Sequence, residues 1–142
     1  MTFKNLTSVT LAVKDLQTAQ HFYVDGLGFV ADDFEGVNHP MGEARFFWFS
    51  GMRLGLWPIS NMRMDTGANL SLVRSGAVYG LSVSSTEEVS MLVQSAVQMG
   101  GTLLVKPREN FWGGFSGYIT DPDDHIWEVI FDPGVLRCPT ES

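Results

Sequence analysis

Residues 121–129 read Asp-Pro-Asp-Asp-His-Ile-Trp-Glu-Val, a turn-like segment followed by a strand-like one. Its first half is rich in Asp and Pro, which are typical of tight turns. Its second half alternates apolar and polar side chains with the period of two that indicates a β-strand. Trp127 and Val129 are therefore expected to face a helix-covered core, while Glu128 faces the opposite side of the sheet.

The residues before this turn predict one unit of a strand, a helix and three strands. Residues 78–83 read as the first strand, and Ser85 with Glu88 forms a capping box at the start of a helix. Apolar residues recur at helical spacing until Gly100 and Gly101 end that helix. Three further strands are expected, at residues 102–105, 117–120 and 126–131.

The first half of the chain repeats this pattern. Residues 8–13 alternate like a strand, and Asp15 is placed to cap a helix that runs from Leu16 toward Val24. Extended segments are expected from Phe29 onward, with a strongly aromatic strand at 45–49 and a return strand at 53–57. Val13 and Val83 each stand just before a helix cap, so the repeat is 83 − 13 = 70 residues long.

Two such repeats predict an α+β fold in a single domain over residues 1–142. We expect module one at about residues 6–60, a linker at 61–76 that packs on the body through its apolar residues, and module two at about 77–133. One helix and one short sheet cannot close a core alone. The two βαβββ modules are therefore expected to form a curved, barrel-like sheet cleft with helices outside, and such a cleft is the default ligand site.

Composition excludes several classes of function. The chain carries 16 acids and 9 bases, a formal net charge of −7, and no run of Lys or Arg, which argues against nucleic-acid binding. It has a single cysteine, so neither an internal disulfide nor a cysteine-based metal site is expected. A signal peptide and an apolar run long enough to cross a bilayer are both missing from the pattern, which predicts a cytoplasmic protein without a membrane partner.

The 121–129 stretch resembles the closing hairpin of the vicinal oxygen chelate superfamily, which includes glyoxalase I, the extradiol dioxygenases, fosfomycin-resistance enzymes and bleomycin-binding proteins. Residues 9–29 and the loop Phe111–Gly114 with the following Gly117-Tyr118 are similar to it too. The resemblance extends from about Ser8 to Pro133. It implies the two-module fold, a small-molecule ligand and a homodimer. Asp124 stands where the family usually has Gly in a left-handed turn, a conformation that Asp tolerates.

The resemblance also implies four metal-ligand positions, and only one of them carries a metal-binding side chain. The opening position of each half falls at Ser8 and at about Val78, and the first-half carboxylate falls within residues 54–57, which contain no acid. Glu128 is the one match. Because a catalytic zinc ion takes three protein ligands, we expect no metal and no other cofactor. No two of the three histidines have the spacing of a metal-ligand pair: His21, His39 and His125.

Glu128 is the candidate catalytic residue and also a candidate for ligand binding. A carboxylate that faces a cleft can hold a cation or donor of the ligand, or act as a general base where burial raises its pKa. An internal hydrogen bond is the alternative role. The other candidates for ligand contact come from the aromatic strand and the glycine-rich loop with its neighbours: Phe47, Trp48, Arg108, Phe111, Trp112 and Tyr118. Core packing, a purely structural loop and a surface ion pair are the alternatives for these residues.

Three hypotheses about function remain open. The first is a metal-independent protein that sequesters an aromatic or cationic small molecule in the cleft, which the acidic charge and aromatic content favour. The second is an enzyme of the glyoxalase-like lyase or dioxygenase type, with an atypical metal site or with Glu128 as its acid–base group. The third is a non-catalytic scaffold whose apolar surface binds a partner.

Overall fold

The computed structural model describes residues 1–30, 37–39, 42–111 and 113–134. Module one holds the first strands and helices in chain order: β1 (Ser8–Val13), α1 (Leu16–His21), the π-helical turn η1 (Phe22–Gly26), β2 (Val37–His39), β3 (Gly42–Phe49) and β4 (Met52–Pro58). A short helix follows, α2 (Ile59–Thr66). Module two consists of β5 (Val78–Ser82), α3 (Thr86–Gln98), β6 (Thr102–Glu109), β7 (Phe115–Thr120) and β8 (Ile126–Phe131).

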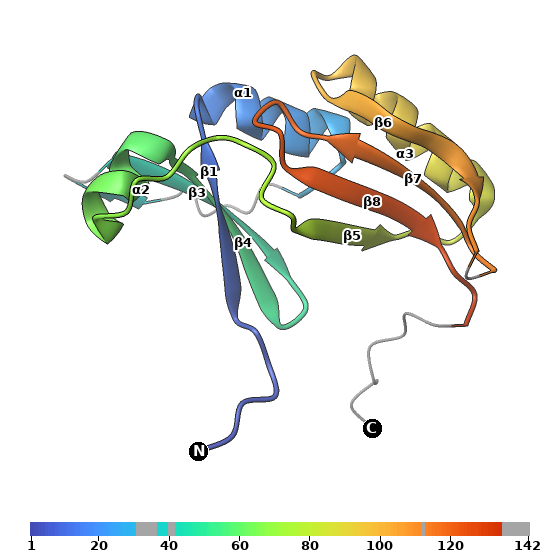
Figure 1. Cartoon of the computed structure of the whole chain (residues 1–142), viewed down its shortest axis with the longest axis horizontal. Helices are drawn as coiled ribbons and strands as arrows, with labels where there is room; N and C mark the ends of the chain where they lie inside the picture. Colours follow the sequence, from blue (N-terminus) through green and yellow to red (C-terminus); the bar gives the residue numbers. More distant parts are fainter. Residues whose placement is uncertain (31–36, 40–41, 112, 135–142) are drawn as a thin grey trace.

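The strands form two four-stranded sheets of the same topology, β1-β4-β3-β2 and β5-β8-β7-β6. In each sheet the first strand pairs in parallel with the last, and the remaining pairs are antiparallel. The α+β class and the two βαβββ modules are thus confirmed. The two sheets stand at an angle to one another and are not closed into a barrel within one chain (Figure 1).

Both helix starts follow the caps that the sequence predicts. The Asp15 side chain accepts a hydrogen bond from the Thr18 amide at 2.8 Å, and Ser85 accepts one from the Glu88 amide at 3.1 Å. The Glu88 carboxylate reaches back to the amide of Ser84, at 2.7 Å. Each cap satisfies amides that the first helical turn leaves free, which fixes where the helix begins.

The region expected to be a linker contains α2 instead of an irregular chain. Gly67 ends this helix with a left-handed φ of 70°. The helix contacts β1 and β4, but none of its residues is buried, and Met64 is 69% exposed. Its contribution to the core is therefore small, and the expected packing of the linker's apolar residues is only partly realised.

One hydrophobic core is shared by the two modules. The buried side chains include Leu11, Leu54 and Phe47 from the first sheet together with Trp127 and Val129 from the second. Aromatic rings join the halves: the Phe29 ring lies 5.4 Å from that of Phe47 and 5.7 Å from that of Trp127. Because the two sheets turn these faces toward a common core, their opposite faces point away from each other.

The 121–129 hairpin fastens module two to module one through a buried polar network. The Tyr23 hydroxyl donates to the Asp121 carboxylate at 2.6 Å and accepts from the Trp127 indole N–H at 3.1 Å. The Asp123 carboxylate accepts from the amide of Lys14 at 2.9 Å. These bonds cross from η1 and the residue after β1 to β8 and the turn before it, so the stretch that predicts the fold also holds its halves together.

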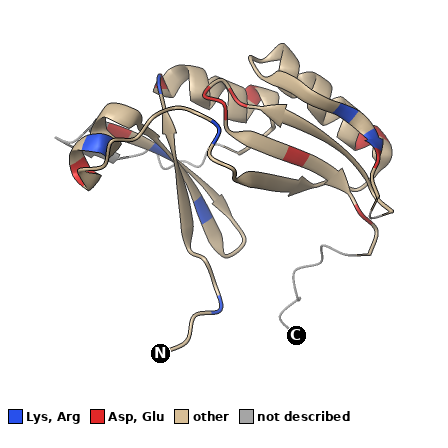
Figure 2. Cartoon of the chain, viewed as in Figure 1, with Lys and Arg blue, Asp and Glu red and all other residues tan. Residues whose placement is uncertain are grey.

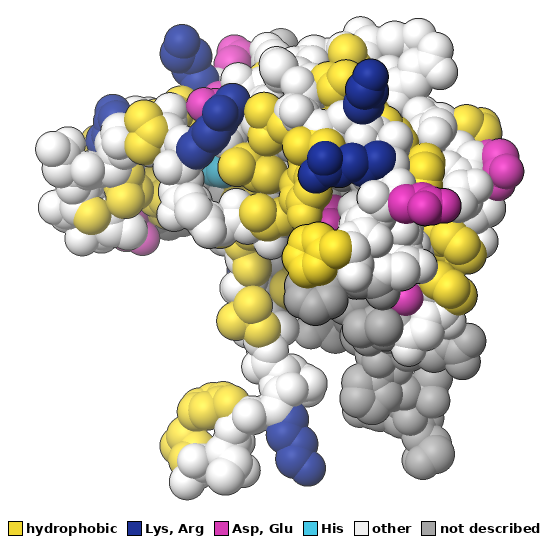
Figure 3. Space-filling model, turned by 45° about the vertical axis from the view of Figure 1, so that its right-hand side comes forward, with side chains coloured by type: hydrophobic (Ala, Val, Ile, Leu, Met, Phe, Trp, Pro, Cys, Tyr) yellow, Lys and Arg dark blue, Asp and Glu magenta, His cyan; other side chains and the backbone are white. Residues whose placement is uncertain are grey.

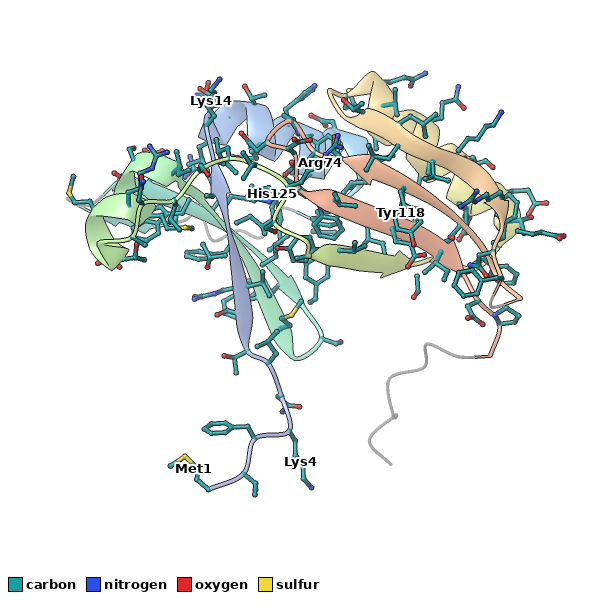
Figure 4. All side chains as sticks on the ribbon, viewed as in Figure 1. Met1, Lys4, Lys14, Arg74, Tyr118 and His125 are labelled. Carbon is teal, nitrogen blue, oxygen red and sulfur yellow. The ribbon has the colours of Figure 1, made fainter. Side chains whose placement is uncertain are left out.

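The turn itself has the geometry expected of it. Asp124 has a φ of 72° and is the one non-glycine residue with positive φ in the described part of the chain. Its carboxylate lies 3.2 Å from Arg74, whose segment leads into β5. The His125 imidazole nitrogen Nε2 lies 2.7 Å from the carbonyl oxygen of Ala12 in β1. Figure 4 shows His125 between the two modules.

Candidate functional site

The face of the second sheet that is turned away from α3 carries the candidate site. Trp127 and Val129 are buried on the α3 side, so the alternation of β8 places Glu128 on the opposite face. Glu128 is half-buried there, and as the acid of β8 it appears as the isolated red position on that strand (Figure 2). The orientation predicted for these three side chains is therefore observed.

Tyr118 lies beside Glu128 on this face. The register pairs Tyr118 of β7 with Glu128 of β8, and Figure 4 shows the Tyr118 side chain standing off the sheet. Burial raises the pKa of the Tyr118 phenol, and a hydrogen bond with Glu128 and the charge of that carboxylate raise it further. The charge of Arg108 on β6 acts on the same phenol and lowers its pKa. A carboxylate, a phenol and a guanidinium thus share one open face.

The corresponding face of the first sheet has a different chemistry. On β3, Phe46 and Trp48 point to this face, and Trp48 is 57% exposed. The Arg53 guanidinium lies 4.3 Å from the centre of the Phe46 ring and 5.6 Å from that of Trp48. Cation–π contacts of this kind orient both the charge and the rings. This face therefore presents aromatic surface and one positive charge.

The structure brings together only some of the residues singled out in the sequence. Glu128, Tyr118 and Arg108 lie on one face, whereas Trp48 lies on the other sheet. Phe47 belongs to neither face, because it is 2% exposed and packs against Tyr23 and Phe29 in the core. Phe111 is 88% exposed in the turn after β6, and Trp112 lies outside the described residues.

Phe46 and Arg53 are the residues on these faces that the sequence interpretation missed. The aromatic run from 46 to 49 shows that one parity must face outward, but not which one. The register settles the question, because Phe46 pairs with Gly55 and Phe47 with Leu54. The one sequence feature that could have pointed to Arg53 is its position two residues before Gly55, because residues two apart lie on the same face of β4.

The register also locates the position of module one that corresponds to Glu128. Glu128 pairs with Gly80 in β5, and the 70-residue repeat makes Gly80 the counterpart of Thr10. Thr10 pairs with Gly55 in β4, so Gly55 stands where module two has Glu128. A Cβ atom at Gly55 would lie 3.1 Å from the Phe46 ring and 3.1 Å from the Thr10 hydroxyl. This position therefore has no metal-binding side chain, and the Phe46 ring and the Thr10 hydroxyl leave little room for one.

These residues do not fit a divalent metal ion. Among the described residues, no three His, Cys, Asp or Glu side chains are grouped closely enough to hold one. Ser8, Gly55 and Val78 offer no carboxylate or imidazole, and Arg53 adds a positive charge beside Gly55. One carboxylate is fewer than the three protein ligands of a catalytic zinc site.

Hydrophobic and charged surfaces can be followed in the space-filling view, where basic side chains lie among apolar ones on the visible face (Figure 3). In the described part of the chain, no helix is long and apolar enough to cross a membrane.

Comparison with known proteins places the chain in a family. The solved structure of a glyoxalase-related enzyme from Fulvimarina pelagi is 28% identical, with a TM-score of 0.85 over 99% of this chain and 96% of that one. A glyoxalase/bleomycin resistance protein/dioxygenase family enzyme from Burkholderia phytofirmans is 19% identical, with a TM-score of 0.73 over 90% and 98%. A fosfomycin resistance protein from Listeria monocytogenes is also 19% identical, with a TM-score of 0.68 over 94% and 97%.

The last two similarities, at such low identity, show the fold alone. No curated protein matches the chain. The sequence model of the glyoxalase/bleomycin resistance protein/dioxygenase superfamily matches residues 5–129, which is most of the chain. Together with the two βαβββ modules, this match shows that the protein belongs to the glyoxalase/bleomycin resistance protein/dioxygenase superfamily.

Proposed function

We propose that the protein binds an aromatic or cationic small molecule without a metal ion, with Glu128 as the central contact. The observation that carries the proposal is the pairing of Glu128 with Tyr118 on an open face, in a chain whose other three metal-ligand positions hold no ligand. A half-buried carboxylate offers two acceptor oxygens to a cationic or hydrogen-bond-donating ligand. Arg108 beside it limits how many positive charges that ligand carries.

The ligand cleft in this proposal is completed by a second copy of the chain. The open faces of the two sheets point away from each other within one chain, so each forms one wall only. A two-fold dimer sets the face with Phe46, Trp48 and Arg53 of one protomer against the face with Glu128 and Tyr118 of its partner. The ligand's ring then stacks on Trp48 while its polar group meets the carboxylate. The oligomeric state and the cytoplasmic location remain predictions.

The test has two parts. Calorimetric titration of chelator-treated protein with zinc, nickel, manganese and iron(II) is expected to give no binding tighter than about millimolar, roughly −4 kcal/mol. A thermal-shift screen of aromatic amines, quaternary ammonium compounds and neutral aromatic compounds is then expected to find ligands whose shift is lost in Glu128→Gln. Tyr118→Phe is the matched variant, because it removes a hydroxyl from the same face and leaves the charge.

Micromolar binding of a metal at one site per chain, lost in Glu128→Gln, would refute the metal-independent role. Ligands that bind Glu128→Gln as well as the unmodified protein would refute the role of the carboxylate.

An enzymatic role is the second candidate, favoured by the pairing of Tyr118 with Glu128 on neighbouring strands of the open face. A carboxylate and a phenol side by side on one face are able to take up and return a proton at neighbouring substrate atoms. Turnover of a hemithioacetal, a thioester or an epoxide, lost in both Glu128→Gln and Tyr118→Phe, would support this candidate over the binding role.

A further inference from the structure

A cavity lies on the core side of the sheets, away from the candidate ligand faces. It is a cavity of about 450 Å³ between the first sheet and the edge of the second. Its lining is apolar and holds no charged side chain: Leu6, Val9, Phe49, Met52, Leu54, Tyr79, Gly80, Leu81 and Trp127. Its floor is core, since Leu54 and Trp127 are almost fully buried, whereas Phe49 at its rim is 38% exposed. Apolar surface of this kind is stabilised by an occupant.

The N-terminal arm, residues Met1–Thr7, begins at this cavity and leaves it. All seven residues are exposed, and the apolar Phe3 and Leu6 are 83% and 66% exposed. The Thr7 carbonyl accepts a hydrogen bond from the Arg53 amide at 2.9 Å, which aligns the root of the arm with β1. The arm therefore continues the direction of β1 and projects clear of both sheets (Figures 1 and 3). Met1 and Lys4 lie near its free end (Figure 4).

We propose that the N-terminal arm of a second copy fills this cavity, so that two protomers exchange arms. An apolar cavity and an exposed apolar arm stand side by side in each chain, with Leu6 at the mouth, and the alignment of Thr7 directs the arm away from its own cavity. A two-fold axis near the mouth brings the partner's arm in from the opposite direction. Each protomer then gives one arm and receives one, as an isologous contact requires.

Charge favours this site over the rest of the surface. Two copies of a chain with a net charge of −7 repel each other, and the repulsion is smallest where the contact holds no acid. The cavity has no charged lining, and the arm's one charged side chain is Lys4, which is attracted to an acidic partner. Because the arms occupy the core side of the sheets, they do not fill the Glu128 and Trp48 faces that the proposed ligand cleft uses.

The inference rests on the homodimer of the proposed function, but not on its ligand. The first experiment measures the dimer dissociation constant of the full chain by sedimentation. We expect Phe3→Ser with Leu6→Ser to raise it by about 100-fold or more, since two apolar side chains per arm lose their burial. Met91→Ser removes an equally exposed apolar side chain from α3 and is the control, expected to leave it unchanged.

The second experiment tests whose arm fills the cavity. In a Cys138→Ser background, Phe3→Cys protein is mixed with Leu81→Cys or Met52→Cys protein and oxidised mildly. Disulfide-linked pairs of the two different chains are expected, at either wall of the cavity. A second protein carries Phe3→Cys and Leu81→Cys in the same chain. A disulfide that forms within this chain, while none forms between the two mixed chains, would overturn the inference. A dimer unaffected by the serine variants would overturn arm exchange alone, and a chain that is monomeric at every concentration would overturn the composite ligand cleft as well.

Discussion

Removing the Tyr23 hydroxyl tests how the two modules are held together, because this hydroxyl forms hydrogen bonds with two buried groups. Tyr23 is fully buried, so water cannot replace its hydroxyl. In Tyr23→Phe the ring and its packing remain. The variant removes the donor that Asp121 accepts at 2.6 Å and the acceptor that the Trp127 indole uses at 3.1 Å.

The expected loss follows from those two bonds. A hydrogen bond to a charged group contributes about 1.5–3 kcal/mol, and a buried donor left unsatisfied costs about 1–3 kcal/mol. Because the two contributions share one hydroxyl, we expect the free energy of unfolding to fall by about 3 kcal/mol, or the melting temperature to fall by roughly 10 °C. The Asp121 carboxylate keeps its bonds to the Asp123 and His125 amides, at 2.9 and 2.8 Å, which limits the damage to one oxygen.

Chemical denaturation followed by circular dichroism measures this loss, and Tyr118→Phe is the matched control. The same hydroxyl is removed there from the open face beside Glu128, where water takes its place, so the expected cost is about 0–1 kcal/mol. If the two variants lie within about 0.5 kcal/mol of each other, below the scale of a single buried hydrogen bond, the buried network does not hold the modules together as described.

Three further predictions concern stability. Burial raises the pKa of Asp121 in the folded protein above its ordinary value of 3.8, so the folded state binds more protons there than the unfolded state. The unmodified protein should therefore gain stability relative to Asp121→Asn as the pH falls from 7 to about 4. Unfolding titrations in which this difference does not change with pH would contradict the assignment. Gly101→Ala is expected to lower the free energy of unfolding by about 2–3 kcal/mol, because its Cβ would lie 2.8 Å from the Thr120 carbonyl oxygen. Gly80→Ala is the control, since a Cβ there meets nothing within 4 Å. In the same denaturation assay it should be neutral or up to about 1 kcal/mol more stable. Asp124→Ala should cost about 1 kcal/mol at a φ of 72° while Asp124→Gly does not, and equal melting temperatures for the two would exclude left-handed strain at this turn.

Local pattern predicted the elements, because their signals are local. The cap at Asp15, the capping box at Ser85 and the alternation around Glu128 each depend on neighbours within a few residues, and the structure has all three. Helix α2 escaped prediction because its apolar stripe is weak and none of its residues is buried. Its formation depends on contacts with β1 and β4, which the sequence alone does not reveal.

The site was less predictable because it depends on register. A one-residue slip moves every side chain of a strand to the other face, so the aromatic run could not say whether Phe46 or Phe47 points outward. Pairing with β4 decides it, and Phe47 belongs to the core. The open faces of the two sheets point away from each other because of how the two halves pack. No local sequence pattern contains that information.

The register at Gly55 also separates two explanations for the absence of a carboxylate at this position of module one. A site that had only lost its ligands would keep an open space at that position, and a restored carboxylate would fit into it. Here the Phe46 ring and the Thr10 hydroxyl both lie 3.1 Å from where a Cβ would be, and the Arg53 guanidinium covers the same ring. A carboxylate at residue 55 would have to displace the ring, and its nearest charge would be Arg53 instead of a metal ion. The first sheet is therefore packed around aromatic rings at this position, which favours recognition of a ring over coordination of a cation on this wall of the proposed cleft.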